Sequence, residues 1–284
     1  MTTYLADAAQ DLYVEGASAR FGYRRLGPQG GVPLVLLNRY RGTLDWWDPE
    51  FLEYLAQAHD LILVDNVGIG YSSGQPRDSV EELAEGAIEF IEALGLSQVD
   101  LLGWSLGGMT AQHVALQRPD LVRKLVVAGA TPGGQIPGAP PPSEKAGAIM
   151  AKPESSADDL VTLFFPETEE ARATGYAHLA KVGTRLASNP PGISVEAAIA
   201  GGTAIGKFAM APLDQVRVNL AAAKHPTLFA AAMGDILIPA IASYFAVENI
   251  ASPSTLVVYS DGGHGFLFQH IKAFTDEVKA FIAA

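Results

Sequence analysis

The chain alternates between uninterrupted apolar runs and stretches whose apolar residues recur at helical spacing. A strand buried on both faces reads as an uninterrupted apolar run, and such strands are typical of parallel sheets. Residues 79–94 place their apolar side chains on one stripe and their glutamates elsewhere, which predicts an amphipathic helix. Further helices are predicted over 106–117 and about 268–283. The apolar runs occupy residues 32–38, 61–65, 99–105, 121–129, 226–233 and 254–262.

The first thirty residues follow a different pattern, with apolar and polar positions alternating on either side of Gly16. This alternation predicts an antiparallel hairpin of two strands. Along the rest of the chain, strands that alternate with helices imply right-handed crossovers and helices on both faces of the sheet. The sequence therefore predicts an α/β fold with a mostly parallel, twisted sheet.

The alternation of strands and helices is interrupted after Gly129. Residues 130–145 are rich in Gly and Pro, which predicts irregular structure. Helical spacing then returns, and no strong strand run follows until about His225. We therefore predict a helical insertion after the sixth strand. Its helices are predicted over about 155–164, 168–187 and 194–207, the whole insertion over 135–212, and the core over 1–134 and 213–284.

The charge of the chain argues against two classes of partner. The 284 residues include 31 Asp and Glu against 19 Lys and Arg, a formal net charge of −12. Such a surface repels nucleic-acid phosphates and anionic membranes, and the sequence has no basic patch to reverse this. We therefore expect a small-molecule substrate and neither nucleic acid nor membrane as a partner. The choice between a monomer and a homodimer stays open.

The chain contains no cysteine, which excludes disulfides, thiolate metal sites and a cysteine nucleophile. No signal peptide is visible at the N-terminus, and no stretch approaches the roughly 18 apolar residues of a membrane helix. We expect a cytoplasmic protein. Phosphate-loop, zinc and EF-hand motifs are missing from the sequence, and we expect neither a metal nor a cofactor.

The strongest chemical signal is the pentapeptide Gly103-Trp104-Ser105-Leu106-Gly107. It matches G-x-S-x-G, with an apolar strand before it and a predicted helix directly after it. Such a sharp turn needs small residues beside the serine, and it raises the hydroxyl above the sheet. The first free N–H groups of the helix, that of Leu106 included, then point toward a developing oxyanion. Ser105 is therefore the candidate nucleophile.

A serine nucleophile needs a base, and His264 is the candidate among six histidines. It follows the last predicted strand and has glycine on both sides, as suits a loop that carries an imidazole over the sheet edge. Asp235, after the preceding strand, is the candidate carboxylate that orients the imidazole. The competing carboxylates are Asp65, Asp214 and Asp261. Asp261 is too close in sequence to face His264 easily, and Asp65 is expected to brace loops.

The order Ser105, Asp235, His264 along alternating strands and helices resembles that of the α/β-hydrolase superfamily. The resemblance covers the whole chain and includes the segments that begin at Asp65, Asp235 and Asp261. It implies an α/β-hydrolase fold with a helical cap inserted after the sixth strand. It also implies a Ser-His-Asp site between core and cap, although the fold does not set the substrate.

One loop departs from the pattern of that superfamily. Many relatives carry His-Gly-x-Pro-Gly after the third strand, where backbone N–H groups complete the oxyanion hole. This chain has Asn38-Arg39-Tyr40-Arg41-Gly42 at that place. Alignment at Gly42 assigns the second N–H of the oxyanion hole to Tyr40.

Three side chains near the nucleophile are candidates for contact with substrate. Arg39 and Arg41 could hold a substrate carboxylate or the oxyanion. Alternatively they pair with nearby carboxylates and hold loops together, which we favour because loop arginines usually have structural partners. Trp104 could line an apolar pocket, and ordinary core packing is at least as good an interpretation. The carboxylates are Asp45, Asp48 and Asp65, and the other aromatic candidates are Trp46, Trp47, Phe164 and Phe165.

The sequence thus predicts a serine hydrolase that cleaves a carboxylic ester, thioester or lactone of a small, largely apolar substrate through an acyl group on Ser105. Two alternatives use the same three residues: a cofactor-free perhydrolase or haloperoxidase-like activity, and a hydrolase or lyase of carbon–carbon bonds. A third is a ligand-binding homologue with little turnover. Haloalkane dehalogenases and epoxide hydrolases are disfavoured because they need a carboxylate in place of Ser105.

Overall fold

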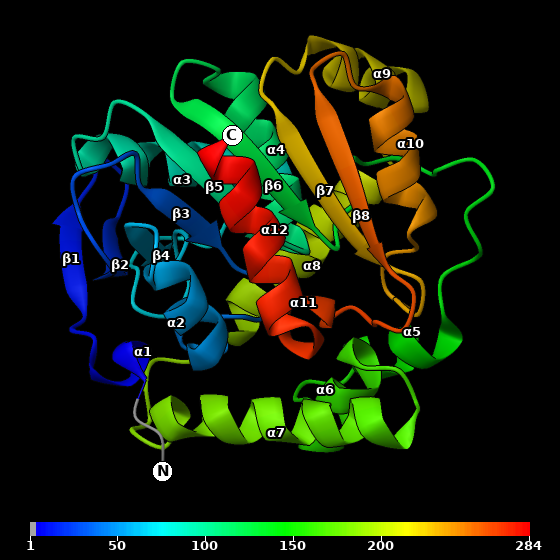
Figure 1. Cartoon of the computed structure of the whole chain (residues 1–284), viewed down its shortest axis with the longest axis horizontal. Helices are drawn as coiled ribbons and strands as arrows, with labels where there is room; N and C mark the ends of the chain where they lie inside the picture. The colour runs from blue at the N-terminus through cyan, green and yellow to red at the C-terminus, as the bar shows by residue number, and fades with distance from the viewer. Residues whose placement is uncertain (1–3) are drawn as a thin grey trace.

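The computed structural model describes residues 4–284, whose eight strands form one sheet in the order β1-β2-β4-β3-β5-β6-β7-β8 (Figure 1). β1 and β2 form the predicted antiparallel hairpin, β2 pairs antiparallel with β4, and the remaining pairs are parallel. The predicted mostly parallel α/β architecture is confirmed. The strands are β1 (Leu12–Glu15), β2 (Arg20–Leu26), β3 (Leu34–Leu37), β4 (Leu61–Val64), β5 (Val99–Trp104), β6 (Val122–Ala128), β7 (Thr227–Ala232) and β8 (Ser254–Tyr259).

Helices cover both faces of this sheet. One face packs against α3 (Val80–Ala93), α4 (Leu106–Gln117), α9 (Leu213–Ala222) and α10 (Ile241–Asn249), and the other against α2 (Pro49–Ala56), α11 (Phe266–Gln269) and α12 (Ile271–Ala283). In β3, Val35 and Leu37 enter the first core, whereas Leu34 and Leu36 enter the second. Successive residues of a strand point to opposite faces, so both sets must be apolar. This explains the uninterrupted apolar run.

Helices also fill the chain between β6 and β7, as predicted. They are α5 (Glu144–Met150), α6 (Ala157–Phe164), α7 (Glu169–Leu186) and α8 (Val195–Ala209), followed by α9, which packs on the sheet. In Figure 1, α5, α6 and α7 lie beyond the ends toward which β7 and β8 point. Among the contacts that join this segment to the core, the Tyr40 hydroxyl donates to the Ala198 carbonyl over 2.8 Å, and His178 Nδ1 lies 2.8 Å from Asp48 Oδ2. The domain boundaries at 135 and 212 stay predictions.

Three details differ from the sequence-based expectations. The run 254–262 predicts a strand buried on both faces, but β8 is the last strand of the sheet and is largely half-buried or exposed. The stretch 130–145 is irregular only as far as Ser143, whose side chain caps α5. The last helix begins at Ile271, after the separate short helix α11.

None of the helices within residues 4–284 combines the length and the apolar character needed to cross a bilayer. The cytoplasmic location stays a prediction.

Two further short helices belong to the N-terminal part of the chain. They are α1 (Leu5–Ala8) and the 3₁₀ helix η1 (Leu44–Trp46).

Candidate active site

Ser105 occupies the sharp turn between β5 and α4. Its backbone has φ 58° and ψ −122°, a left-handed conformation that costs free energy for any residue with a side chain. A Cβ on Gly103 would collide with the Gly107 carbonyl, and a Cβ on Gly107 would collide with the Leu37 carbonyl. Both glycines of the G-x-S-x-G pattern are therefore required by close backbone approach, and the turn exists as the sequence predicts.

His264 and Asp235 meet at the same edge of the sheet. Asp235 follows β7, and His264 lies in the loop between β8 and α11. His264 Nδ1 is 2.7 Å from Asp235 Oδ2, and both side chains are almost completely buried. The other oxygen of Asp235 accepts the backbone N–H groups of Leu237 at 2.8 Å and Ile238 at 2.9 Å. Asp235 is therefore held from both sides, which fixes the orientation of the imidazole.

The competing carboxylates lie elsewhere. Asp261 is 3.1 Å from Nε2 of His270, and Asp214 is exposed beside Arg217. Asp65 braces loops as expected, because its carboxylate accepts the N–H groups of Leu44 at 2.7 Å and Tyr71 at 2.9 Å. Burial raises the pKa of the Asp65 carboxyl to about 7, although these two N–H groups act in the opposite direction.

Ser105 and His264 both line a cavity of about 430 Å³ between the sheet edge and the helices that follow β6. Its wall is mainly apolar, and α6 supplies a large share of it. Leu163 and Phe164 of α6 are buried there, which the amphipathic spacing of that helix would have suggested. Of the proposed aromatic residues, Trp46 and Phe164 reach the cavity. The remaining apolar side chains are Tyr40, Met109, Met150, Pro153, Leu160, Ile205, Leu237 and Ile238.

Two backbone N–H groups beside Ser105 have no acceptor within residues 4–284. They belong to Leu106, the first residue of α4, and to Tyr40 in the loop after β3. Two other N–H groups of that loop are occupied, since Arg39 donates to the Asn38 side chain at 2.7 Å and Gly42 donates to the Arg39 carbonyl at 3.1 Å. The pair expected to bind an oxyanion is thus available for hydrogen bonding.

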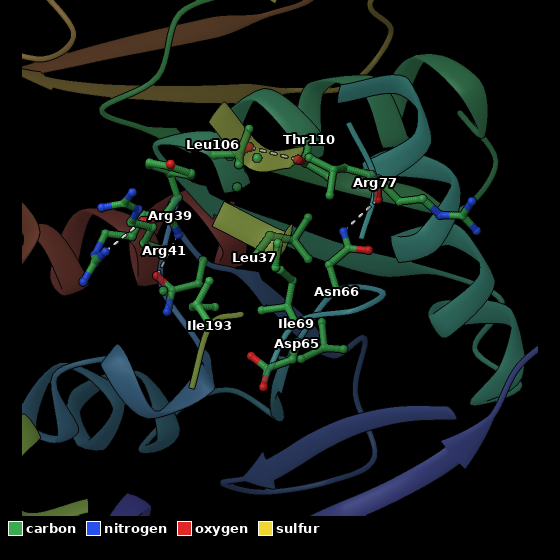
Figure 2. A pocket seen from close by; sticks show the side chains of 18 residues that line it. Leu37, Arg39, Arg41, Asp65, Asn66, Ile69, Arg77, Leu106, Thr110 and Ile193 are labelled. Carbon is green, nitrogen blue, oxygen red and sulfur yellow. Dashed lines mark hydrogen bonds between the residues drawn. The ribbon is translucent and has the colours of Figure 1, made fainter. Parts of the chain in front are cut away.

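A second, smaller pocket of about 60 Å³ lies beside this loop. Figure 2 shows Arg39, Arg41 and Leu106 at one end of it and Asp65, Asn66 and Arg77 among the side chains farther along. The Thr110 hydroxyl on its wall donates to the Leu106 carbonyl over 2.9 Å. The two pockets share the loop that carries Tyr40.

The expectation that Arg39 and Arg41 pair with nearby carboxylates is wrong. Arg24 and Arg185 occupy Asp45, His178 and Lys181 occupy Asp48, and backbone N–H groups occupy Asp65. The Arg41 guanidinium instead donates to the Lys152 carbonyl over 2.8 Å, which ties its loop to the end of α5. The competing basic residues lie far away in sequence, so the pairing could not be anticipated locally.

Arg39 is buried in the wall of the larger cavity. Its guanidinium carbon lies 4.8 Å from the Phe164 ring centroid, 5.0 Å from Trp46 and 5.6 Å from Trp104. Nη1 donates to the Tyr40 carbonyl over 2.8 Å, and Nε has no partner within the described residues. Burial lowers the pKa of Arg39 to about 9, so the side chain is cationic at neutral pH.

Trp104 does not contact the cavity, so of its two interpretations ordinary core packing agrees with the structure and lining of the pocket does not. The indole is fully buried, packs edge-on against Phe268 and Phe164, and donates from Nε1 to the His264 carbonyl over 3.0 Å. It therefore supports the loop that carries the imidazole. Trp47 and Phe165 are likewise buried outside the cavity lining.

Sequence reasoning did not identify the buried group formed by Asp48, His178 and Lys181. Asp48 caps α2 through the N–H of Glu50 and accepts from both α7 side chains at 2.8 Å. The spacing of His178 and Lys181, which places both side chains on one face of a helix, could have indicated that they share a partner. In the part of the chain that the structure describes, no three His, Asp or Glu side chains are placed to share a metal ion. That the protein uses neither metal nor cofactor stays a prediction.

Comparison with known proteins agrees with this geometry. A family model described as the alpha/beta hydrolase fold matches residues 32–271. A solved structure, an alpha/beta hydrolase fold protein from Chitinophaga pinensis, superposes with a TM-score of 0.86 at 28% identity and covers 98% of both chains.

Two curated relatives differ in how much of the chain they match. The putative carbamate hydrolase RutD of Azorhizobium caulinodans is 27% identical over 259 residues, which cover 89% of this chain and 91% of that protein. The serine hydrolase BPHL of Mus musculus is 39% identical over 101 residues, but this region is only 34% of this chain and 29% of the mouse protein.

Proposed function

Because the chain belongs to the alpha/beta hydrolase family, we propose that it is a serine hydrolase acting on a carboxylic ester, thioester or lactone of a small, largely apolar substrate. The observation that carries the proposal is the 2.7 Å contact between His264 Nδ1 and Asp235, beside a cavity that the imidazole shares with Ser105. An imidazole whose Nδ1 is held by a carboxylate leaves Nε2 available as a base.

In the proposed first half-reaction, His264 Nε2 takes the Ser105 proton as Oγ attacks the substrate carbonyl carbon. The carbonyl π electrons move to oxygen, and the oxyanion accepts hydrogen bonds from the N–H groups of Leu106 and Tyr40. Collapse of this intermediate expels the alcohol, which takes the proton from His264. The acyl group remains on Ser105. Asp235 stabilises the imidazolium formed during this step.

In the second half-reaction a water enters the site and gives a proton to His264 Nε2 while its oxygen attacks the acyl carbon. The bond to Ser105 Oγ breaks, the carboxylic acid is released, and the proton returns to Ser105. The apolar cavity wall supports a largely apolar acyl or alcohol group.

The test is hydrolysis of p-nitrophenyl acetate and butyrate by the wild type and by Ser105→Ala. We expect turnover by the wild type and a loss of about six orders of magnitude in kcat in the variant, as for removal of a serine nucleophile. Ser155→Ala is the matched control because Ser155 lines the same cavity without occupying the turn.

A fluorophosphonate probe followed by peptide mass spectrometry gives an independent readout. The phosphonyl group should be found on Ser105, and Ser155→Ala should still react. Turnover that survives in Ser105→Ala would refute the proposed nucleophile. Labelling of Ser105 without turnover of either ester would favour a ligand-binding homologue or a different bond.

One finding favours a second candidate bond, the carbamate. The putative carbamate hydrolase RutD of Azorhizobium caulinodans matches 89% of this chain. Attack by Ser105 on a carbamate carbonyl uses the same base and the same N–H donors. Parallel assays with phenyl acetate and phenyl N-methylcarbamate distinguish the two, since faster turnover of the carbamate would make it the preferred substrate class.

A further inference from the structure

We propose that Arg39 binds a free carboxylate on the substrate, so that the hydrolysed compound is an ester carrying a second, ionised carboxyl group. This inference rests on the proposed function, because it names the substrate class of the same site. It starts from the Arg39 guanidinium, which is buried in the cavity wall and has no acidic partner within residues 4–284.

A buried cation without a counter-ion is costly, and proteins usually pair such a group. Here the guanidinium has five N–H donors, yet one bond to the Tyr40 carbonyl is its only hydrogen bond to the described residues. The three aromatic rings around it stabilise the positive charge through their faces but accept no strong hydrogen bond. An anion entering the cavity would supply the missing acceptors.

The geometry of a guanidinium suits a carboxylate, since two parallel N–H groups match its two oxygens. Two other charged side chains that line the cavity, Arg41 and Glu154, are less suited to bind a buried carboxylate. Arg41 is partly exposed and bonded to the Lys152 carbonyl, and Glu154 is exposed. The cation therefore stands in a mainly apolar wall, where low polarity strengthens an ion pair.

Two other roles for Arg39 make different predictions. As an additional oxyanion donor, it would assist every ester equally, whereas Leu106 and Tyr40 already offer two N–H groups for that purpose. As a purely structural residue that packs against the aromatic rings, it would affect folding and all substrates together. Only carboxylate binding discriminates between charged and neutral substrates.

The experiment compares kcat/KM for two matched pairs of esters. Monomethyl glutarate against methyl pentanoate places the charge on the acyl side, and 4-acetoxybutanoate against butyl acetate places it on the alcohol side. In the wild type we expect one charged ester to exceed its neutral counterpart by about 10- to 100-fold, the range for hydrogen bonds to a charged group. Arg39→Met should reduce that ratio to about one or lower, and Arg39→Lys should restore part of it. Arg41→Gln, the matched arginine control, should retain the ratio.

A neutral preference in both pairs, or equal losses for charged and neutral esters in Arg39→Met, would overturn the proposal. Failure of the esterase assignment is recognised separately, by calorimetric titration of glutarate into Ser105→Ala. Saturable binding that disappears in Ser105→Ala/Arg39→Met supports the carboxylate site even if no ester is hydrolysed. Absence of binding, with a normal thermal unfolding transition, contradicts it.

Discussion

At the scale of single residues, the strained turn at Ser105 is possible because Gly103 and Gly107 carry no side chain. Neither position has room for one. Gly103→Ala should lower the free energy of unfolding by about 3 kcal/mol, the upper range for an overpacked site, and should displace the serine. Gly147→Ala is the matched control, since its Cβ meets no atom within 4 Å and lies in α5. There the change should stabilise by about 0.4–1 kcal/mol.

Urea unfolding of both glycine variants measures the difference directly. Equal stability of the Gly103 and Gly147 variants would mean that the turn relaxes without cost. A loss of probe labelling at Ser105 in the Gly103 variant, at a temperature where the variant remains folded, would separate displacement of the hydroxyl from unfolding.

The contribution of Asp65 to stability should depend on pH. Its pKa in the folded protein is about 7, raised by burial, against about 3.9 in an unfolded chain. The folded state therefore binds more protons between these values. The contribution of Asp65 to stability is complete below pH 4 and is lost as the pH rises through 7. Carbon-13 NMR of the side-chain carboxyl should give a midpoint near 7, and a midpoint below 5 contradicts the prediction.

At the scale of elements, two carboxylates connect α7 to α2: the buried Asp48, and Glu50, which accepts from Lys181 over 2.8 Å. Asp48 caps α2 and accepts from His178 and Lys181 of α7. Asp48→Ala should cost about 3–5 kcal/mol, because it removes one partner of a buried charged group. Lys181→Met, which removes a partly exposed partner, should cost about 1 kcal/mol or less. Chemical unfolding measures both, and a loss of about 1 kcal/mol or less for Asp48→Ala would show that the buried contact is unimportant.

Hydropathy predicted the interior strands because their two faces are both buried, as the four residues of β3 illustrate. It failed for β8, whose apolar run resembles that of an interior strand although the sheet ends there. The sequence shows where each strand lies along the chain, but it does not show which strands are neighbours in the sheet. Helices α9 and α10 were not predicted, because their apolar residues form a less regular stripe than those of α3. Helix α2 was missed because it has 8 residues against 14 in α3, although its stripe is about as regular.

Some residues of the candidate site could be predicted from the sequence, and others could not. Ser105 was marked by the small residues that its turn requires, and His264 and Asp235 by their positions after strands. The partners of Arg39 and Arg41 were not predictable, since Asp45 and Asp48 are occupied by residues distant in sequence. The two interpretations of Trp104 could not be separated, because the sequence shows which residue neighbours the serine but not the face to which its side chain points.

At the scale of the whole molecule, the helices after β6 limit the size of the cavity. With about 430 Å³ available, kcat/KM along a series of p-nitrophenyl esters from acetate to decanoate should fall for the longer chains. Leu163→Ala, which enlarges the wall formed by α6, should move the optimum toward longer chains. Leu52→Ala in α2, buried away from the cavity, should lower stability without moving the optimum.

Ser105, Asp235 and His264 follow β5, β7 and β8, so the three residues meet only after the last strand has joined the sheet. During synthesis on a ribosome, the serine and its strained turn emerge long before the imidazole. Under the proposed function, a nascent chain builds most of the sheet before Ser105 can react. Reactivity toward a phosphonate probe would then show that β8 and the loop after it have joined the sheet, so that labelling during synthesis follows the completion of the fold.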